Sequence, residues 1–243
     1  MTIALVDADI VAYRAAASCK EDDEQDIALI RTDKTMQEIM SDVGATGHKV
    51  FLSGSRETNF RYKVSLDYKA NRVDMVRPVH LEAAKMFLVT QWGAEVCTGY
   101  EADDGLGMAQ KPSGTTICSI DKDLLMIPGS HWNFVKKEHR IVTPEQGLRA
   151  FYTQLLTGDV SDNVIGLRGI GPVKAARILD AVAPDDWYLA CLDAYSGDKE
   201  RMHKNGKLLW IFQKENDIWQ PPKDEKEPVQ QSGTPLGVRD LVS

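Results

Sequence analysis

The sequence predicts an α/β fold with a mostly parallel central sheet flanked by helices, followed by a C-terminal helical region. Four short apolar runs are typical of buried parallel strands, and they lie at 2–6, 49–52, 94–98 and 115–120. Helix-like stretches at 79–92 and 101–110 fall between these runs, so that strands and helices alternate along the chain. Such alternation is typical of a sheet covered by helices on both faces.

The helical region begins after residue 142. Thr143 suits the N-cap, and Pro144 the first position, of a helix that we expect to reach about Thr157. The glycine sequence GLRGIG then leads through a tight turn into a second helix at 172–182. We therefore expect an α/β core with a basic arch or clamp segment, a helical subdomain with a helix-hairpin-helix, and a flexible tail, over 1–142 (arch near 54–80), 143–220 and 221–243.

The composition is that of an ordinary globular protein, with 43% hydrophobic and 27% charged residues among 243. No run approaches the roughly 18 consecutive apolar residues of a membrane span, and the first residues lack the pattern of a signal peptide. We expect a cytoplasmic protein with no membrane partner. The four cysteines have no metal or disulfide spacing and fit buried thiols: Cys19, Cys97, Cys118 and Cys191.

The charges are unevenly distributed along the chain. The net charge of −7 argues by itself against a nucleic-acid partner. The segment 56–77 nevertheless holds six bases against three acids, and 166–177 holds three bases and no acid. Positive patches are therefore expected beside a concentration of acids elsewhere.

Eight acidic residues stand at predicted strand and helix ends: Asp7, Glu101, Asp103, Asp104, Asp121, Asp123, Asp159 and Asp162. The first six follow strands whose carboxyl ends meet at one edge of a parallel sheet, where such sheets bind ligands. Any one of them alone fits a helix's first turn or a loop. Two unit charges 4 Å apart repel by about 4 kcal/mol at an effective dielectric near 20, so the acids together require a cation.

The donor set selects the kind of cation. Carboxylate oxygens without His or Cys at matching spacings favour Mg²⁺ or Mn²⁺ over Zn²⁺. Two such ions activate a water and stabilise a departing oxygen when a phosphodiester is cleaved. The sequence therefore predicts a two-metal hydrolytic site.

Two segments are suited to hold a nucleic-acid backbone. In the hairpin segment, free N–H groups at the start of a helix and the bases after it can bind phosphate, and the candidates are Gly169, Gly171, Val173, Lys174 and Arg177. The other segment, 59–72, interleaves aromatic and basic residues, as a strand-binding surface does, and its candidates are Arg61, Lys63 and Tyr68. A plain helical turn and a solvated basic face are the structural alternatives.

These motifs resemble the 5′-nuclease superfamily: flap endonucleases, the 5′-exonuclease domain of bacterial DNA polymerase I and, most closely, the stand-alone exonucleases of T-odd bacteriophages. The resemblance covers residues 1–182. It rests on five stretches in the family's order, namely LVDAD, YKANR, EADD, SIDKD and GDVSDNVIGLRGIGPVKAARIL. It implies a PIN-like core and a 5′-3′ exonuclease or flap endonuclease that cleaves DNA, and RNA in RNA–DNA hybrids, in the host cytoplasm if phage-encoded.

The resemblance also implies residue roles. The eight acids would hold two divalent ions, directly or through water. Lys69 and Arg72 would be the catalytic arch residues that steer the scissile phosphate, with Tyr68 near the terminal nucleotides. The hairpin would grip the duplex, in some relatives with a K⁺ ion. The resemblance leaves open the choice between exonuclease and flap endonuclease, although the short arch segment favours the former.

One position departs from the family's pattern. The family usually has an Asp just after the second strand, where this chain has Ser53 or Gly54. Either the first ion keeps an extra water there, or Asp9 compensates.

Two other functions compete with the nuclease. A haloacid-dehalogenase-type phosphatase would use Asp7 and Asp9 after a strand and GDVSDN as its metal acids, but that family places the second motif after a strand, whereas here it follows a helix. A non-catalytic DNA-binding module would use the hairpin and basic segment alone. It leaves the acids repelling phosphate for no benefit.

Overall fold

The computed structural model describes residues 1–73 and 75–222, which form two compact units. The first unit, the α/β unit, contains 1–60, 75–144 and 211–217, and the second, the helical unit, contains 61–73, 145–210 and 218–222. The chain therefore passes between the units more than once. Part of the expected arch belongs to the helical unit, and the expected tail falls outside the described residues apart from 221 and 222.

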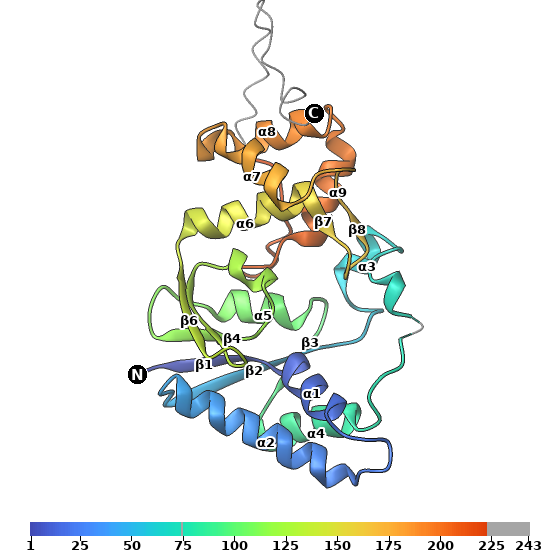
Figure 1. The fold of residues 1–243 in the computed structure, drawn as a ribbon, viewed down its shortest axis with the longest axis vertical. Helices are drawn as coiled ribbons and strands as arrows, with labels where there is room; N and C mark the ends of the chain where they lie inside the picture. The colour runs from blue at the N-terminus through green and yellow to red at the C-terminus, as the bar shows by residue number, and fades with distance from the viewer. Residues whose placement is uncertain (74, 223–243) are drawn as a thin grey trace, which may run out of the picture. The chain divides into compact units, whose positions relative to one another are not determined.

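A six-stranded sheet forms the centre of the α/β unit (Figure 1). In spatial order its strands are β3 (Glu95–Cys97), β2 (Gly47–Ser53), β1 (Ile3–Asp7), β4 (Thr115–Cys118), β5 (Gly129–Asn133) and β6 (Glu138–Val142). The first five run parallel, and β6 pairs antiparallel with β5. The predicted mostly parallel sheet is confirmed. The hairpin of β5 and β6 is an addition that the apolar runs did not reveal.

Helices cover both faces of this sheet. Figure 1 shows α1 (Ala8–Ala17), α2 (Gln25–Asp42) and α4 (Leu81–Trp92) on one side and α5 (Ala102–Ala109) on the other. The core between the three helices and the sheet is apolar and includes Val6, Val11, Met36, Leu52 and Leu88. On the opposite face a Cβ at Gly105 would lie 2.7 Å from the Phe51 ring, so only glycine lets α5 pack this closely on β2.

The helical unit is built from short helices and one hairpin, whose two strands have two residues each. Its elements are α6 (Pro144–Thr157), β7 (Gly158–Asp159), β8 (Val164–Ile165), α7 (Pro172–Asp180), α8 (Trp187–Ala194) and α9 (Lys199–Leu209). The first predicted helix has the bounds expected from its Pro start, and α7 ends two residues before the expected position. A further helix, α3 (Phe60–Val64), begins at the boundary between the units.

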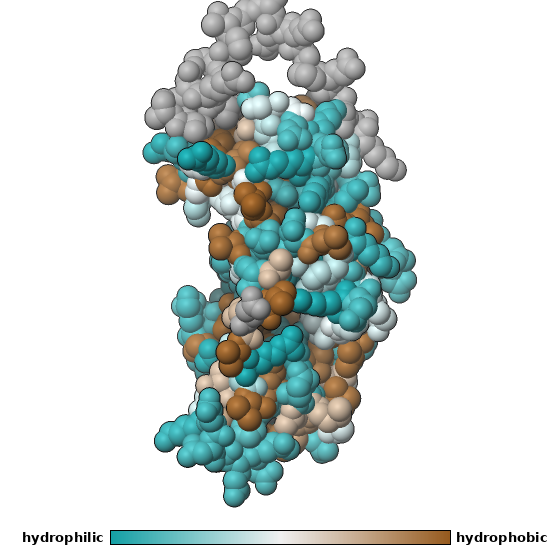
Figure 2. Space-filling model, turned by 90° about the vertical axis from the view of Figure 1, so that its right-hand side faces the viewer, coloured by the Kyte–Doolittle hydropathy of each residue, from teal (hydrophilic) through white to brown (hydrophobic). Residues whose placement is uncertain are grey.

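Three of the four cysteines are buried as expected, whereas Cys19 is half-buried. All four cysteines are free, and Cys97, Cys118 and Cys191 are buried. Within the described part of the chain, no helix has the length and apolar character needed to cross a membrane. On the face drawn in Figure 2, hydrophobic side chains form separate groups among hydrophilic ones.

Candidate active site

Six of the eight predicted metal-binding acids stand at one edge of the sheet in the α/β unit. Because β3, β2, β1 and β4 are parallel, their carboxyl ends share an edge. Asp7 ends β1, and Asp121 and Asp123 follow β4. Glu101 caps α5 just after β3, with Asp103 and Asp104 in that helix's first turn. We call this set of acids the carboxyl edge.

Asp7 is almost fully buried at the carboxyl edge, with 2% of its surface exposed. Its Oδ1 accepts a hydrogen bond from the Ile10 N–H, which caps α1, and its Oδ2 accepts one from the Ser119 hydroxyl at 2.7 Å. The same hydroxyl oxygen accepts from the Asp121 N–H at 3.0 Å. Ser119 therefore links the acids that follow β1 and β4, a role with no signal in the sequence.

Burial determines the protonation of Asp7. Removal from water raises the pKa of its carboxyl to about 7, the Ser119 hydrogen bond opposes the rise, and the charges of Asp9 and Asp121 add to it. Burial is therefore the main cause of the raised pKa, and the neighbouring charges contribute less.

Asp104 differs from the other acids of the carboxyl edge because it is fully buried. One oxygen accepts from the Glu101 N–H at 2.9 Å, which completes a capping box. The other accepts from the Phe212 N–H at 3.0 Å and so ties the 211–217 segment to α5. Asp104 thus positions the start of α5, while Glu101 and Asp103 are partly exposed.

The departure from the family's pattern has a steric explanation at Gly54. A Cβ at Gly54 would lie 2.2 Å from the Cys97 carbonyl oxygen, so an Asp does not fit there. The Ser53 hydroxyl accepts from the Ala102 N–H at 3.0 Å, and the Ser53 N–H donates to Asp9 Oδ2 at 2.8 Å. Asp9 also pairs with Lys85, whose Nζ lies 2.9 Å from Oδ1.

In the helical unit the GDVSDN and YKANR motifs, about ninety residues apart in sequence, meet at Asp162. This carboxylate accepts from the Tyr68 hydroxyl at 2.8 Å and from an Arg72 nitrogen at 2.7 Å, and Lys69 Nζ lies 3.6 Å away. The Lys69 N–H also donates to the Asp162 carbonyl. Both predicted catalytic cations therefore contact one predicted metal ligand, and we call this group the Asp162 cluster.

Asp159 organises the same turn. Its Oδ1 accepts from the backbone N–H groups of Ser161 and Asp162, and its Oδ2 accepts from the Gln154 side chain at 3.0 Å. It is 7% exposed. These bonds hold the turn that presents Asp162 to the basic segment.

Two predicted DNA contacts in the basic segment point inward. Arg61 is 2% exposed and donates to the carbonyls of Leu208 at 2.9 Å and Trp210 at 2.6 Å. Tyr68 is also 2% exposed, with its hydroxyl on Asp162. Arg61 therefore anchors α3 to the end of α9 in place of the expected surface contact, whereas Lys63 is exposed.

The hairpin between β8 and α7 is open to solvent. Gly169 has φ of +77°, which favours glycine, and Gly171 is the N-cap of α7. A Cβ at either glycine would meet no atom within 4 Å. Val173 is 68% exposed, and Lys174 and Arg177 follow on the same helix. The predicted hairpin residues thus form a surface that a backbone phosphate can approach.

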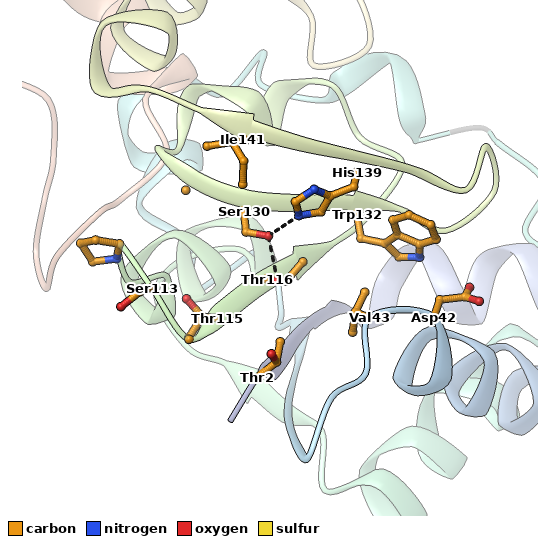
Figure 3. A pocket seen from close by; sticks show the side chains of 13 residues that line it. Thr2, Asp42, Val43, Ser113, Thr115, Thr116, Ser130, Trp132, His139 and Ile141 are labelled. Carbon is orange, nitrogen blue, oxygen red and sulfur yellow. Dashed lines mark hydrogen bonds between the residues drawn. The ribbon is translucent and has the colours of Figure 1, made fainter.

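A separate hollow of about 500 Å³ lies at the amino-terminal edge of the sheet, away from the predicted residues (Figure 3). The Ser130 hydroxyl inside it bonds with the Thr116 hydroxyl at 2.9 Å and the His139 ring at 2.8 Å. None of the predicted site residues lines it.

No three His, Cys, Asp or Glu side chains among the described residues lie close enough together to hold a metal ion. The carboxylate oxygens of Asp7, Asp104, Asp159 and Asp162 are hydrogen-bonded or ion-paired within the protein. The carboxyl edge thus provides suitable donors without a preformed three-residue cage.

The fold and the acids define an α/β domain with an acid-lined carboxyl edge, joined to a helical unit with an exposed glycine hairpin. Residues 2–153 match the family model described as the 5′-3′ exonuclease, N-terminal resolvase-like domain. The chain therefore belongs to this family, and the predicted 5′-nuclease superfamily is confirmed.

Curated relatives match part of the chain. A 5′-3′ exonuclease of Buchnera aphidicola is 29% identical over 163 residues, which are 60% of this chain and 56% of the relative. DNA polymerase I of Borreliella burgdorferi is 31% identical over 134 residues, 49% of this chain and 14% of the polymerase. The thermostable DNA polymerase I of Thermus aquaticus is 32% identical over 144 residues, which are 52% of this chain and 17% of the polymerase. The chain spans just over half of the first relative and less than a fifth of these polymerases.

Solved structures share the fold. A protein of bacteriophage T5 co-crystallized with metal ions has a TM-score of 0.70 at 16% identity, covering 86% of this chain and 89% of that one. The T5 flap endonuclease in complex with DNA and metal ions has a TM-score of 0.60 at 16% identity, covering 86% of this chain and 98% of that one. At this identity the likeness establishes the α/β architecture.

Proposed function

We propose that the chain is a divalent-metal-dependent 5′-3′ nuclease that hydrolyses phosphodiester bonds of DNA at 5′ ends or 5′ junctions. The observation that carries the proposal is the set of acids at the ends of β1, β3 and β4, where a parallel sheet binds its ligands. Membership of the 5′-3′ exonuclease family supports it. It also agrees with the T5 structures of the same fold, which were solved with metal ions and with DNA.

The acids of the carboxyl edge fit Mg²⁺ or Mn²⁺. All donors in this set are carboxylate oxygens, which selects a hard cation. Divalent ions bound there would supply an activated water and a counter-charge for the leaving 3′ oxygen. We assign metal binding to Asp7, Glu101, Asp103, Asp121 and Asp123, with Asp104 positioning the start of α5.

In the helical unit we assign metal binding to Asp159 and Asp162, and phosphate steering to Lys69 and Arg72. Lys69 and Arg72 both form ion pairs with Asp162, so an incoming phosphate must compete with that carboxylate for them. Their catalytic role is to hold the scissile phosphate by charge-assisted hydrogen bonds. Tyr68 keeps this cluster in place through its hydroxyl.

We propose that the duplex is held by the open hairpin and the bases after it. The N–H groups at the start of α7 and the side chains of Lys174 and Arg177 would bind backbone phosphates without reading sequence. Gly169 and Gly171 leave room for that approach, and Val173 borders it. K⁺ binding at the hairpin, cleavage of RNA–DNA hybrids and a cytoplasmic location remain predictions.

A direct test uses 5′-labelled duplexes with a blunt end, a nick or a 5′ flap, incubated with Mg²⁺ or with EDTA. We expect short labelled products with Mg²⁺ and none with EDTA, and the product lengths decide between exonuclease and flap endonuclease. Binding without cleavage would instead indicate a DNA-binding module. Hydrolysis of p-nitrophenyl phosphate alone would indicate a phosphatase. Repeating the assay with Na⁺ in place of K⁺, and with a hybrid duplex, tests the finer predictions.

A further inference from the structure

Asp9 and Lys85 form an ion pair at the carboxyl edge. Asp9 lies in the first turn of α1 and Lys85 on α4, and the Nζ to Oδ1 distance is 2.9 Å. The side chains are 28% and 26% exposed, so solvent reaches the pair without surrounding it. The chain therefore places one of its own cations among the acids.

The position of this pair coincides with the departure from the family's pattern. The Asp9 carboxylate is bonded to the Ser53 N–H at 2.8 Å, so it stands at the end of β2. The family's acid belongs at that point, and neither Ser53, which bonds to the start of α5, nor Gly54, which has no room for a Cβ, can replace it. The acid at the end of β2 thus comes from α1, and it is paired with a lysine.

We propose that the Asp9–Lys85 pair replaces the family's missing carboxylate with an electrically neutral unit, and that Lys85 thereby sets the divalent-ion affinity of the carboxyl edge. This inference rests on the proposed metal-dependent function. A bare Asp9 would add one negative charge two residues from Asp7. Lys85 cancels that charge and leaves Ser53 held in place. Lys85 is therefore a positioning residue, acting through Asp9.

The charge that each variant removes predicts whether Mn²⁺ affinity rises or falls. Lys85→Met exposes the charge of Asp9 and should tighten Mn²⁺ binding roughly fivefold, because an uncancelled negative charge beside the site attracts a divalent ion. Asp9→Asn leaves Lys85 as an unpaired cation and should weaken binding by roughly the same factor. The double variant Asp9→Asn/Lys85→Met restores neutrality, so its affinity should return to within about twofold of the unmodified chain.

The experiment measures Mn²⁺ affinity by calorimetry on the full chain without DNA, for the unmodified protein, both single variants and the double variant. Lys85→Arg keeps the charge and should retain the original affinity. Lys34→Met, which breaks an exposed pair with Glu38 on α2, is the matched control and should change nothing. Thermal unfolding of each variant separates an effect on folding from an effect on binding.

Each outcome decides the matter. A double variant that stays as weak as Asp9→Asn would make Asp9 a direct metal ligand and overturn the neutral-unit proposal. Unchanged affinity in all variants, with only lowered thermal stability, would reduce the pair to a structural link between α1 and α4 and also overturn it. If the unmodified chain bound no Mn²⁺ at all, the metal-dependent function itself would fail, a result distinct from either of these.

Discussion

The carboxyl edge of the α/β unit and the Asp162 cluster of the helical unit contain the same kind of side chain in opposite surroundings. Asp7 is bonded to a hydroxyl and a backbone N–H, and burial raises its pKa to about 7. Asp162 is bonded to a phenol and paired with Lys69 and Arg72. The chain neutralises Asp162 with its own cations, whereas no cation among the described residues pairs with Asp7.

Crowding of acids does not by itself imply a bound metal ion in this protein. Crowded acids require positive charge, but that charge comes from the protein at Asp162 and, through Lys85, at Asp9. At Asp7 the described residues supply no such charge, so a proton or an external cation must supply it. In the helical unit the acid serves first as a docking point for the basic segment 68–72.

Replacing Asp7 tests the comparison with the largest expected effect. The folded protein keeps a proton on Asp7 up to about pH 7, whereas the unfolded chain loses it near pH 3.8, so stability falls as the pH rises between these values. Asp7→Asn keeps the helix cap and removes this loss. In EDTA at pH 8 it should raise the free energy of unfolding by up to about 4 kcal/mol, with much less gain at pH 4. Urea denaturation at both pH values measures it, and equal effects at the two pH values would contradict the assignment.

Arg61 tests whether the cations of the helical unit serve the fold. Arg61→Met leaves the buried carbonyls of Leu208 and Trp210 without their donor and should lower the free energy of unfolding by about 3 kcal/mol. Lys63→Met, in the same helix but exposed, should change stability by less than about 0.5 kcal/mol. Urea denaturation compares them, and equal stability losses would refute the anchoring role.

Gly54 tests whether the carboxyl edge has room for another acid. A Cβ there would lie 2.2 Å from a backbone oxygen, so Gly54→Ala should destabilise the protein by about 2 kcal/mol, and Gly54→Asp should not strengthen Mg²⁺ binding. Calorimetric titration of both variants with Mg²⁺ provides the check. Tighter binding by Gly54→Asp would mean that β2 can accept the family's acid after all.

Replacing Asp162 tests the Asp162 cluster, and we expect the smallest effect on stability from it. Asp162→Ala removes the partner of Tyr68, Lys69 and Arg72 and should cost about 1 kcal/mol, because most of these contacts are partly exposed. The segment 66–73 should then be cleaved faster in limited proteolysis. Asp67→Ala, in the same segment, is the control, and identical cleavage of the two variants would contradict the docking role.

Local patterns in the sequence were sufficient for β1 to β4, for α4 to α7 and for the placement of acids at strand ends, but they did not reveal α1, α2 or the β5–β6 hairpin. Apolar runs set β1, β2, β3 and β4, and parallel pairing then places Asp7 and Asp121 at one edge. Thr143 and Pro144 gave the start of α6. These features depend on residues close together in the chain, which is why they could be predicted.

The partners of the acids could not be predicted, because they come from distant parts of the chain. Ser119 is 112 positions from Asp7, and Phe212 is 108 from Asp104. Arg61 resembled a surface base because the segment around it interleaves aromatic and basic residues, yet its carbonyl partners lie 147 and 149 residues later. Composition does not reveal such pairings.

Asp121 offers the most direct test of metal-dependent cleavage at the carboxyl edge. Asp121→Asn keeps the backbone bond to Ser119 and the size of the side chain but removes a charge that ions would need. We expect DNA affinity in EDTA to stay within about twofold of the unmodified chain, while cleavage of a 5′-labelled duplex with Mg²⁺ falls by about a hundredfold or more. Cleavage at the unmodified rate would contradict the account.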